Sequence, residues 1–122
     1  MKKQILYGDD REDKRTELKA RAESLGYSID LVESPEDFIS RARGNNYDVL
    51  VSDLDYSPEG SEGYMLMKKL EHNPSLRIIY TGRAGFEHIA EGFSSGADHV
   101  VLNKDLGELV EILEKQLKGG EE

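Results

Sequence analysis

The sequence predicts an α/β domain in which helices cover both faces of one parallel, doubly wound sheet. Short apolar runs alternate five times with amphipathic stretches, and the connections between them are short. The apolar run at residues 49–51 is continuous and rich in β-branched side chains, as expected of a strand buried on both faces. We expect one domain over residues 1–118, followed by a flexible tail over residues 119–122.

The first half of the chain is predicted to hold three strands and two helices. The strands are expected at residues 4–7, 27–32 and 47–52, and the helices at residues 11–25 and 34–44. Gly26 fits the left-handed position that follows a helix. Ser34 and Pro35 fit the N-cap and the first position of the second helix.

The second half is predicted to continue the same alternation after a loop rich in Gly, Ser and Pro. The loop is expected at residues 56–63, a helix from there to about His72, strands at 76–80 and 99–102, and helices at 86–96 and 106–117. The last helix has one apolar face with a period of 3.6 residues. Its members are Leu106, Leu109, Val110, Leu113 and Leu117.

Composition excludes several classes of protein. The absence of cysteine excludes a disulfide framework, a thiolate metal site and a cysteine nucleophile, and it fits a reducing cytosol. The 25 acidic residues against 16 basic ones argue against binding of nucleic acid through bulk charge. The longest apolar runs, about four residues, are too short for a membrane span or a signal peptide. We therefore expect a cytoplasmic protein that binds neither nucleic acid nor a membrane directly.

Polar side chains follow four of the five predicted strands. Asp9 and Asp10 follow the first, Asp53 the third, Thr81 the fourth and Lys104 the fifth. The carboxyl ends of parallel strands form the ligand-binding edge of such a sheet, so these side chains are expected to converge. Three carboxylates would repel one another, and a hard divalent cation such as Mg²⁺ would relieve that repulsion. An aspartate can act as a nucleophile toward phosphorus, with lysine and hydroxyl groups binding the phosphoryl oxygens.

This set of residues resembles the receiver domain of response regulators in two-component signalling, of the type found in chemotaxis regulators. Four segments carry the resemblance: ILYGDD at 5–10, YDVLVSDLD at 47–55, IIYTG at 78–82 and GADHVVLNK at 96–104. The resemblance covers residues 1–118. It implies a flavodoxin-like (βα)5 fold with strand order 2-1-3-4-5.

The resemblance also implies roles for the residues at the strand ends. Asp53 would be the phosphoacceptor, Thr81 would bind a phosphoryl oxygen as the switch hydroxyl, and Lys104 would pair with the phosphate. The implied Mg²⁺ ligands are Asp9, Asp10, Asp53 and the backbone carbonyl of Asp55.

The implied function is a regulatory phosphoacceptor rather than an enzyme, although it would catalyse its own phosphorylation and dephosphorylation. The phosphodonor would be a phosphohistidine on a histidine kinase or a phosphotransfer protein. Only five residues follow Leu117, so we expect the output to be a contact with a protein partner, made by a monomer or weak dimer.

The sequence departs from the family's pattern at three places. The family usually has Lys-Pro at the end of the segment that begins with Gly-Ala-Asp. Counted from Gly96, Asn103 stands at the position of that lysine. A one-residue bulge in the strand would return Lys104 to the site. We favour Lys104, because the acidic edge needs a cation. The aromatic residue of the fifth strand is replaced by Val100 or Val101. The loop after Asp53 is about two residues longer, with glycines that give it freedom.

Two flanking residues are candidate modulators of the site. Asp55 lies two residues after the predicted acceptor, and Arg83 two residues after Thr81. Our hypothesis is that they form an ion pair that partly covers Asp53 and slows hydrolysis of its acyl phosphate. The alternative is a pair of solvated charges of little consequence. Tyr80, which precedes Thr81, is predicted to serve packing.

Two other functions stay open. The shifted lysine, the missing aromatic residue and the altered loop favour a degenerate receiver that acts as a phosphorylation-independent binding module. Asp53-Leu54-Asp55 also resembles the first motif of haloacid-dehalogenase-type phosphatases. In that superfamily, however, the acidic metal motif follows the lysine, whereas Asp9 and Asp10 precede Lys104 here.

Overall fold

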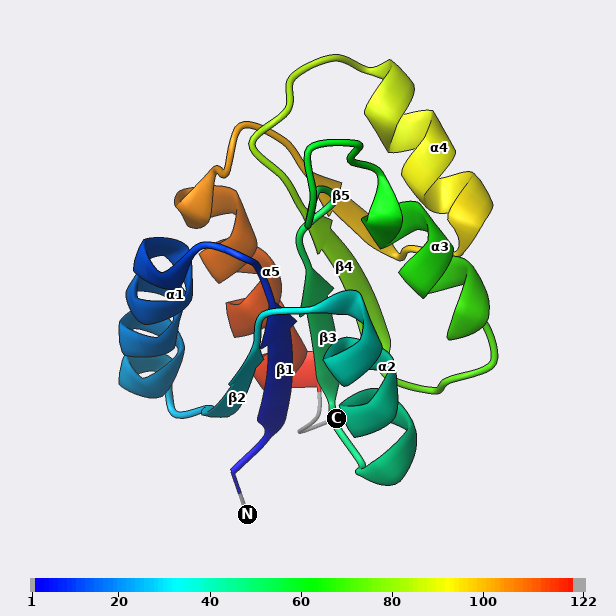
Figure 1. The fold of residues 1–122 in the computed structure, drawn as a ribbon. Helices are drawn as coiled ribbons and strands as arrows, with labels where there is room; N and C mark the ends of the chain where they lie inside the picture. Colours follow the sequence, from blue (N-terminus) through cyan, green and yellow to red (C-terminus); the bar gives the residue numbers. More distant parts are fainter. Residues whose placement is uncertain (1, 120–122) are drawn as a thin grey trace.

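Five parallel strands form one sheet, and helices cover both of its faces (Figure 1). The computed structural model describes residues 2–119. The strands are β1 Gln4–Gly8, β2 Ser28–Val32, β3 Val49–Ser52, β4 Leu76–Tyr80 and β5 His99–Val101. The helices are α1 Glu12–Leu25, α2 Pro35–Gly44, α3 Glu62–Lys69, α4 Glu87–Ser95 and α5 Leu106–Gly119. The strand order β2-β1-β3-β4-β5 confirms the predicted fold class and topology.

The predicted signals at the ends of the first two helices are confirmed. Gly26 is left-handed, with φ of 101°, and caps α1. Ser34 Oγ accepts a hydrogen bond from the Asp37 N–H at 3.2 Å, so Ser34 is the N-cap of α2, with Pro35 behind it. These contacts satisfy backbone groups that a helix end leaves without a partner.

Some element ends differ from the prediction. Helix α3 ends at Lys69 rather than near His72, because the Leu70 N–H is shared between the carbonyls of Leu66 and Met67 and the chain turns there. Helix α5 extends through Gly119, one residue into the predicted tail, and residues 120–122 lie outside the described residues. None of the described helices combines the length and the apolar character needed to cross a membrane.

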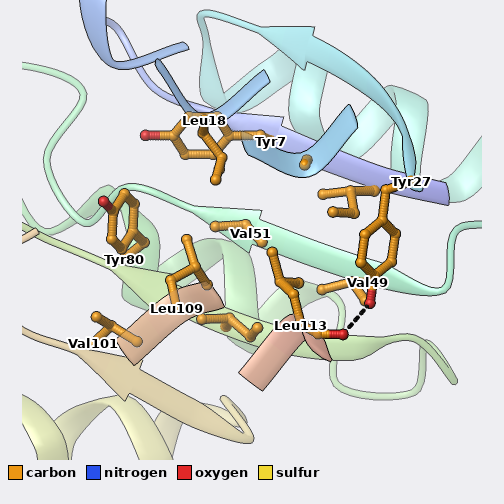
Figure 2. Packing of buried hydrophobic residues seen from close by; sticks show 12 residues of the cluster. Tyr7, Leu18, Tyr27, Val49, Val51, Tyr80, Val101, Leu109 and Leu113 are labelled. Carbon is orange, nitrogen blue, oxygen red and sulfur yellow. Dashed lines mark hydrogen bonds between the residues drawn. The ribbon is translucent and has the colours of Figure 1, made fainter. Parts of the chain in front are cut away.

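One apolar layer fills the space between the sheet and helices α1 and α5 (Figure 2). At one end of this layer, the Tyr27 hydroxyl donates a hydrogen bond to the Leu113 carbonyl at 2.7 Å. At the other end, the rings of Tyr7 and Tyr80 meet edge to face, with centroids 6.1 Å apart. That end of the layer faces the carboxyl ends of the strands, so two tyrosines lie directly beneath the predicted site.

The opposite face of the sheet is covered by α2, α3 and α4. Gly8, the last residue of β1, faces this side, and a Cβ there would overlap the Tyr56 hydroxyl and lie 2.6 Å from Phe38 Cδ2. The Tyr56 hydroxyl shares a hydrogen bond of 2.8 Å with Ser52 Oγ. The missing side chain at Gly8 thus lets the loop after β3 fold closely over the end of β1.

Strand register brings the predicted site residues to a single edge. Gly8 is paired with Ser52, and the Asp53 N–H continues this ladder with a bond of 2.8 Å to the Gly8 carbonyl. The Thr81 N–H likewise donates to the Val101 carbonyl at 3.0 Å. Residues that directly follow the strands are therefore held by backbone hydrogen bonds, which fixes where their side chains begin.

Candidate functional site

Three carboxylates gather at the carboxyl edge of the sheet. Asp9, Asp10 and Asp53 each offer one oxygen, and these three oxygens lie within 4.8 Å of one another. Asp9 and Asp53 are buried, whereas Asp10 is exposed. Asp10 and Asp53 also line a hollow of about 500 Å³. A larger hollow of about 970 Å³ lies away from these carboxylates, at the opposite edge of the sheet, so size alone does not locate the site.

Lys104 supplies the positive charge at this edge. Its Nζ lies 2.6 Å from Asp9 Oδ2 and 3.5 Å from Asp53 Oδ1, and its side chain is 13% exposed. Asn103, the other candidate for this position, is exposed. The residue that the structure brings into the site is therefore Lys104.

The route by which Lys104 reaches the site differs from the predicted bulge. Strand β5 ends at Val101, and Asn103 and Lys104 then adopt consecutive left-handed conformations, with φ of 60° and 46°. The Lys104 N–H donates to the Thr81 carbonyl at 2.7 Å, and the Asn103 N–H donates to the Arg83 carbonyl at 2.9 Å. The extra residue is thus absorbed in the loop after β5, where two left-handed residues turn the lysine inward.

Thr81 and Arg83 belong to one turn after β4. Thr81 is fully buried, and its Oγ1 accepts a hydrogen bond from the Arg83 N–H at 3.1 Å. The Thr81 carbonyl also accepts the hydrogen bond from the Lys104 N–H. A movement of Thr81 would therefore displace Arg83 and the loop that holds Lys104.

The predicted ion pair between Arg83 and Asp55 is confirmed. Arg83 Nε donates to Asp55 Oδ2 at 2.9 Å, and Arg83 Nη2 contacts Asp55 Oδ1. Asp55 Oδ1 also accepts the Ser61 N–H at 2.9 Å. Gly60, with φ of 77°, lies so close beneath this pair that a Cβ would overlap the Asp55 carboxylate. The pair joins the loop after β3 to the turn after β4 across the mouth of the site.

The three carboxylates do not carry charge equally. Burial raises the pKa of Asp53 from 3.8 to about 7, with Lys104 opposing the shift and Asp9 adding to it. For Asp9, burial also opposes ionisation, but Lys104 and hydrogen bonds from Tyr7 and the Arg11 N–H outweigh it and lower the pKa. Burial and the neighbouring Asp9 raise the pKa of Asp10. Asp9 is therefore the carboxylate that ionises most readily, and it is paired with Lys104.

This donor set suits a hard divalent cation. Three carboxylate oxygens within 4.8 Å, one of them exposed to solvent, can meet a single ion that keeps several waters. Burial, together with the charge of Asp9, raises the pKa of Asp53 and of Asp10, and a bound cation would favour the ionised form of both carboxylates. The acidic cluster thus fits Mg²⁺, with the Asp55 carbonyl as a predicted further ligand.

Sequence reasoning missed the hydroxyl group of Tyr7. This hydroxyl is buried and donates a hydrogen bond to Asp9 Oδ2 at 2.5 Å. Tyr80 packs in the core, as predicted, but it also lies beneath Lys104, whose Nζ is 4.6 Å from the centre of its ring. The signal that was available is strand alternation, which puts the last apolar side chain before Asp9 on the α1 and α5 face.

Comparison with known proteins agrees with this geometry. The model of the response regulator receiver domain family matches residues 5–114. A two-component response regulator from Clostridium difficile is 26% identical, with a TM-score of 0.85, over 96% of this chain and 97% of that one. The BeF3-activated DrrB receiver domain is 23% identical, with a TM-score of 0.80, over 97% and 99% of the two chains. A gliding motility regulatory protein of Myxococcus xanthus is 26% identical over 113 residues, which are 89% of this chain but 14% of that protein.

The raised pKa of Asp53 predicts how stability depends on pH without divalent cations. The folded protein holds the Asp53 proton more tightly than the unfolded chain does, so Asp53 contributes less to the free energy of unfolding as the pH rises from about 4 to about 7. The Asp53→Asn side chain does not titrate, so this variant lacks that decrease in the free energy of unfolding. We expect the melting temperature of Asp53→Asn, relative to the wild type in EDTA, to rise by about 5 °C between about pH 5 and pH 8.

Thermal melts followed by circular dichroism test this expectation, with Glu23→Gln, an exposed carboxylate on α1, as the control. Added Mg²⁺ at the higher pH should narrow the difference by stabilising the wild type. A difference between Asp53→Asn and wild type that stays constant or shrinks as the pH rises would contradict the charge assignment.

Proposed function

This chain belongs to the response regulator receiver domain family, and from that premise we propose that it is a phosphoacceptor signalling domain whose acceptor is Asp53. One observation carries the proposal. The Asp53 carboxylate shares an edge with two further acids that suit a cation and with Lys104, whose Nζ is 3.5 Å from Asp53 Oδ1. A nucleophile, a cation site and a positive counter-charge thus lie together. Family membership replaces the phosphatase interpretation of the Asp53-Leu54-Asp55 motif.

The reaction we propose is one transfer of a phosphoryl group to Asp53. A carboxylate oxygen attacks the phosphorus of a phosphohistidine on a histidine kinase or phosphotransfer protein. The new O–P bond forms as the N–P bond breaks, and the imidazole leaves with the electron pair and takes a proton from water. Mg²⁺ bound by Asp9, Asp10, Asp53 and the Asp55 carbonyl would supply charge neutralisation for the transferring group.

The protein's own cation would bind the product. Lys104 Nζ lies closer to Asp9 than to Asp53, so pairing with a phosphoryl oxygen requires it to move from Asp9 Oδ2 toward the acceptor. A phosphoryl group carries more negative charge than the carboxylate that it replaces, and this favours the movement. Phosphorylation of Asp53 would therefore shift the position of the Lys104 ammonium group.

We propose that Thr81 and Arg83 pass this change to the surface. The Thr81 hydroxyl would donate a hydrogen bond to a phosphoryl oxygen. The side-chain rotamer that Thr81 adopts to do so would decide whether its Oγ1 still accepts the hydrogen bond from the Arg83 N–H. Arg83 in turn holds Asp55 and the loop after β3. The result would be a population shift between two arrangements of these loops, which a protein partner distinguishes. This route does not need the aromatic residue in whose place the fifth strand has Val100 or Val101.

A second candidate is a binding module that takes no phosphate. The observation that favours it is the ion pair between Lys104 and Asp9, whose 2.6 Å separation shows that the protein can balance part of the acidic charge without a cation. Among residues 2–119, no basic side chain lies as close to Asp10 or Asp53 as Lys104 lies to Asp9, and this supports the phosphoacceptor. Phosphorylation of Asp53 separates the two candidates.

Incubation with a small-molecule phosphodonor and Mg²⁺ tests the acceptor and the lysine together. We expect mass spectrometry to find one phosphoryl group on the wild type and none on Asp53→Asn. Lys104→Ala should be labelled about tenfold more slowly, since it loses the counter-charge. Asn103→Ala should be labelled as the wild type is, because Asn103 is exposed. Equal labelling of Asp53→Asn, or an equal loss in Asn103→Ala and Lys104→Ala, would refute the assignment.

The ion pair between Arg83 and Asp55 predicts the lifetime of the acyl phosphate. Because the pair joins two loops across the mouth of the site, we propose that it limits the approach of water to Asp53. Arg83→Ala and Asp55→Ala should each shorten the half-life by about three- to tenfold. The control is Arg41→Ala, which removes an exposed ion pair with Asp30 on another part of the surface. Half-lives that match the wild type would show that the pair does not protect the phosphate.

A further inference from the structure

Backbone hydrogen bonds from Asn103 and Lys104 to the carbonyls of Arg83 and Thr81 hold the loop that carries this lysine, but they do not fix where its side chain ends. Asn103 and Lys104 are consecutive left-handed residues, a conformation that side chains other than glycine adopt at a cost. Asn103 is exposed, and Asp105 follows in the loop that leads to α5. Yet the Lys104 side chain is mostly buried and has a defined direction. The groups that surround this side chain therefore set its direction.

Tyr80 holds Lys104 at three points. The Tyr80 hydroxyl donates a hydrogen bond to the Lys104 carbonyl at 3.1 Å. Lys104 Nζ donates in return to the Tyr80 carbonyl at 3.1 Å. The same Nζ lies 4.6 Å from the centre of the Tyr80 ring, within the range of a cation–π contact. Tyr80 thus binds both the backbone and the charged end of the lysine.

Tyr7 closes the other side. Lys104 Nζ is 5.8 Å from the centre of the Tyr7 ring and donates to its hydroxyl at 3.4 Å. The Tyr7 hydroxyl donates to Asp9 Oδ2, the same oxygen that Lys104 contacts. The Tyr7 ring also meets that of Tyr80 edge to face, which fixes the two rings relative to each other (Figure 2). Tyr7 and Tyr80 together form what we call the tyrosine notch.

We infer that the tyrosine notch positions Lys104 between Asp9 and Asp53, and that Tyr7 and Tyr80 are therefore positioning residues for the lysine that binds the phosphoryl group. The part that concerns the phosphoryl group rests on the proposed function, whereas the position of Lys104 does not. The notch explains how the chain keeps a cation at the site although Asn103 stands at the usual lysine position. Two aromatic rings and three hydrogen bonds hold the Lys104 side chain and carbonyl, in addition to the backbone bonds of the loop.

Core packing alone is the competing explanation for two buried tyrosines, and Tyr27 provides a matched control. Tyr27 is buried in the same apolar layer, and its hydroxyl also bonds a backbone carbonyl, that of Leu113. It lies at the opposite end of the layer from the notch (Figure 2). Tyr27→Phe therefore reports the effect of losing one buried tyrosine hydroxyl without touching Lys104.

The first test uses NMR of the protein without metal or phosphate. The ε-CH2 protons of Lys104, assigned by their loss in Lys104→Arg, should be shifted upfield of those of other lysines by the two tyrosine rings. Tyr80→Phe keeps both rings but removes the bond to the Lys104 carbonyl, so the upfield shift should shrink. Tyr27→Phe should leave it unchanged. An ordinary Lys104 shift in the wild type, or no change in Tyr80→Phe, would overturn the inference.

The second test is a double-mutant cycle on binding of beryllofluoride, a phosphoryl mimic, in the presence of Mg²⁺. Tyr7→Phe and Tyr80→Phe should each weaken binding several-fold, and Tyr27→Phe should not. In a Lys104→Ala background Tyr80→Phe should have no further effect, since Tyr80 acts through the lysine. Tyr7→Phe should keep part of its effect there, since its hydroxyl also bonds Asp9.

Equal losses from Tyr80→Phe in the two backgrounds would show that Tyr80 does not act through Lys104 and would overturn the inference. A wild type that binds no beryllofluoride would instead refute the proposed function, and the NMR test would then decide the inference alone. All three Tyr→Phe variants keep their rings in the core, so they preserve its packing.

Discussion

Lys104 Nζ lies between two buried carboxylates, at 2.6 Å from Asp9 and 3.5 Å from Asp53, and the arrangement of the site depends on this contact. The lysine can balance the charge of only one carboxylate. It favours Asp9, which leaves Asp53 with a pKa raised by burial and Asp10 with little compensation. The ionised carboxylates at this edge therefore carry more negative charge than Lys104 balances. In the proposed function a divalent cation would supply the missing positive charge, and a phosphoryl group on Asp53 would then give the lysine a new anion to bind.

The fold serves this site by bringing four chain segments to one edge. Backbone hydrogen bonds that extend the strand ladders fix Asp9, Asp53 and Thr81. Arg83 links the loops that follow the strands. Its side chain binds the Asp55 carboxylate. Its backbone N–H donates to the Thr81 hydroxyl, and its carbonyl accepts the Asn103 N–H. Three loops thus share one arginine. In the proposed function, a local change at the acceptor would reach the surface through this residue.

The sequence was sufficient to predict the fold class and to place three acids at strand ends, because hydrophobic alternation and turn residues are local properties. The strand order followed from the resemblance to receiver domains, not from local patterns. The sequence was also sufficient to propose the pair between Arg83 and Asp55. It could not predict how Lys104 enters the site, since that depends on two left-handed residues whose conformation no local preference requires. Nor could it predict the hydroxyl contacts of Tyr7 and Tyr80, because both tyrosines satisfy the apolar pattern of their strands whether or not their hydroxyls have polar partners.

A crystal structure of the protein with Mg²⁺ and beryllofluoride would test the central claim most directly. The account predicts an adduct on Asp53, with Lys104 Nζ within hydrogen-bond distance of a fluorine atom and still flanked by Tyr7 and Tyr80. Mg²⁺ would be bound by the carboxylates of Asp9, Asp10 and Asp53. A structure with no adduct on Asp53, or one in which the Asn103 side chain contacts the fluorine in place of Lys104, would contradict it.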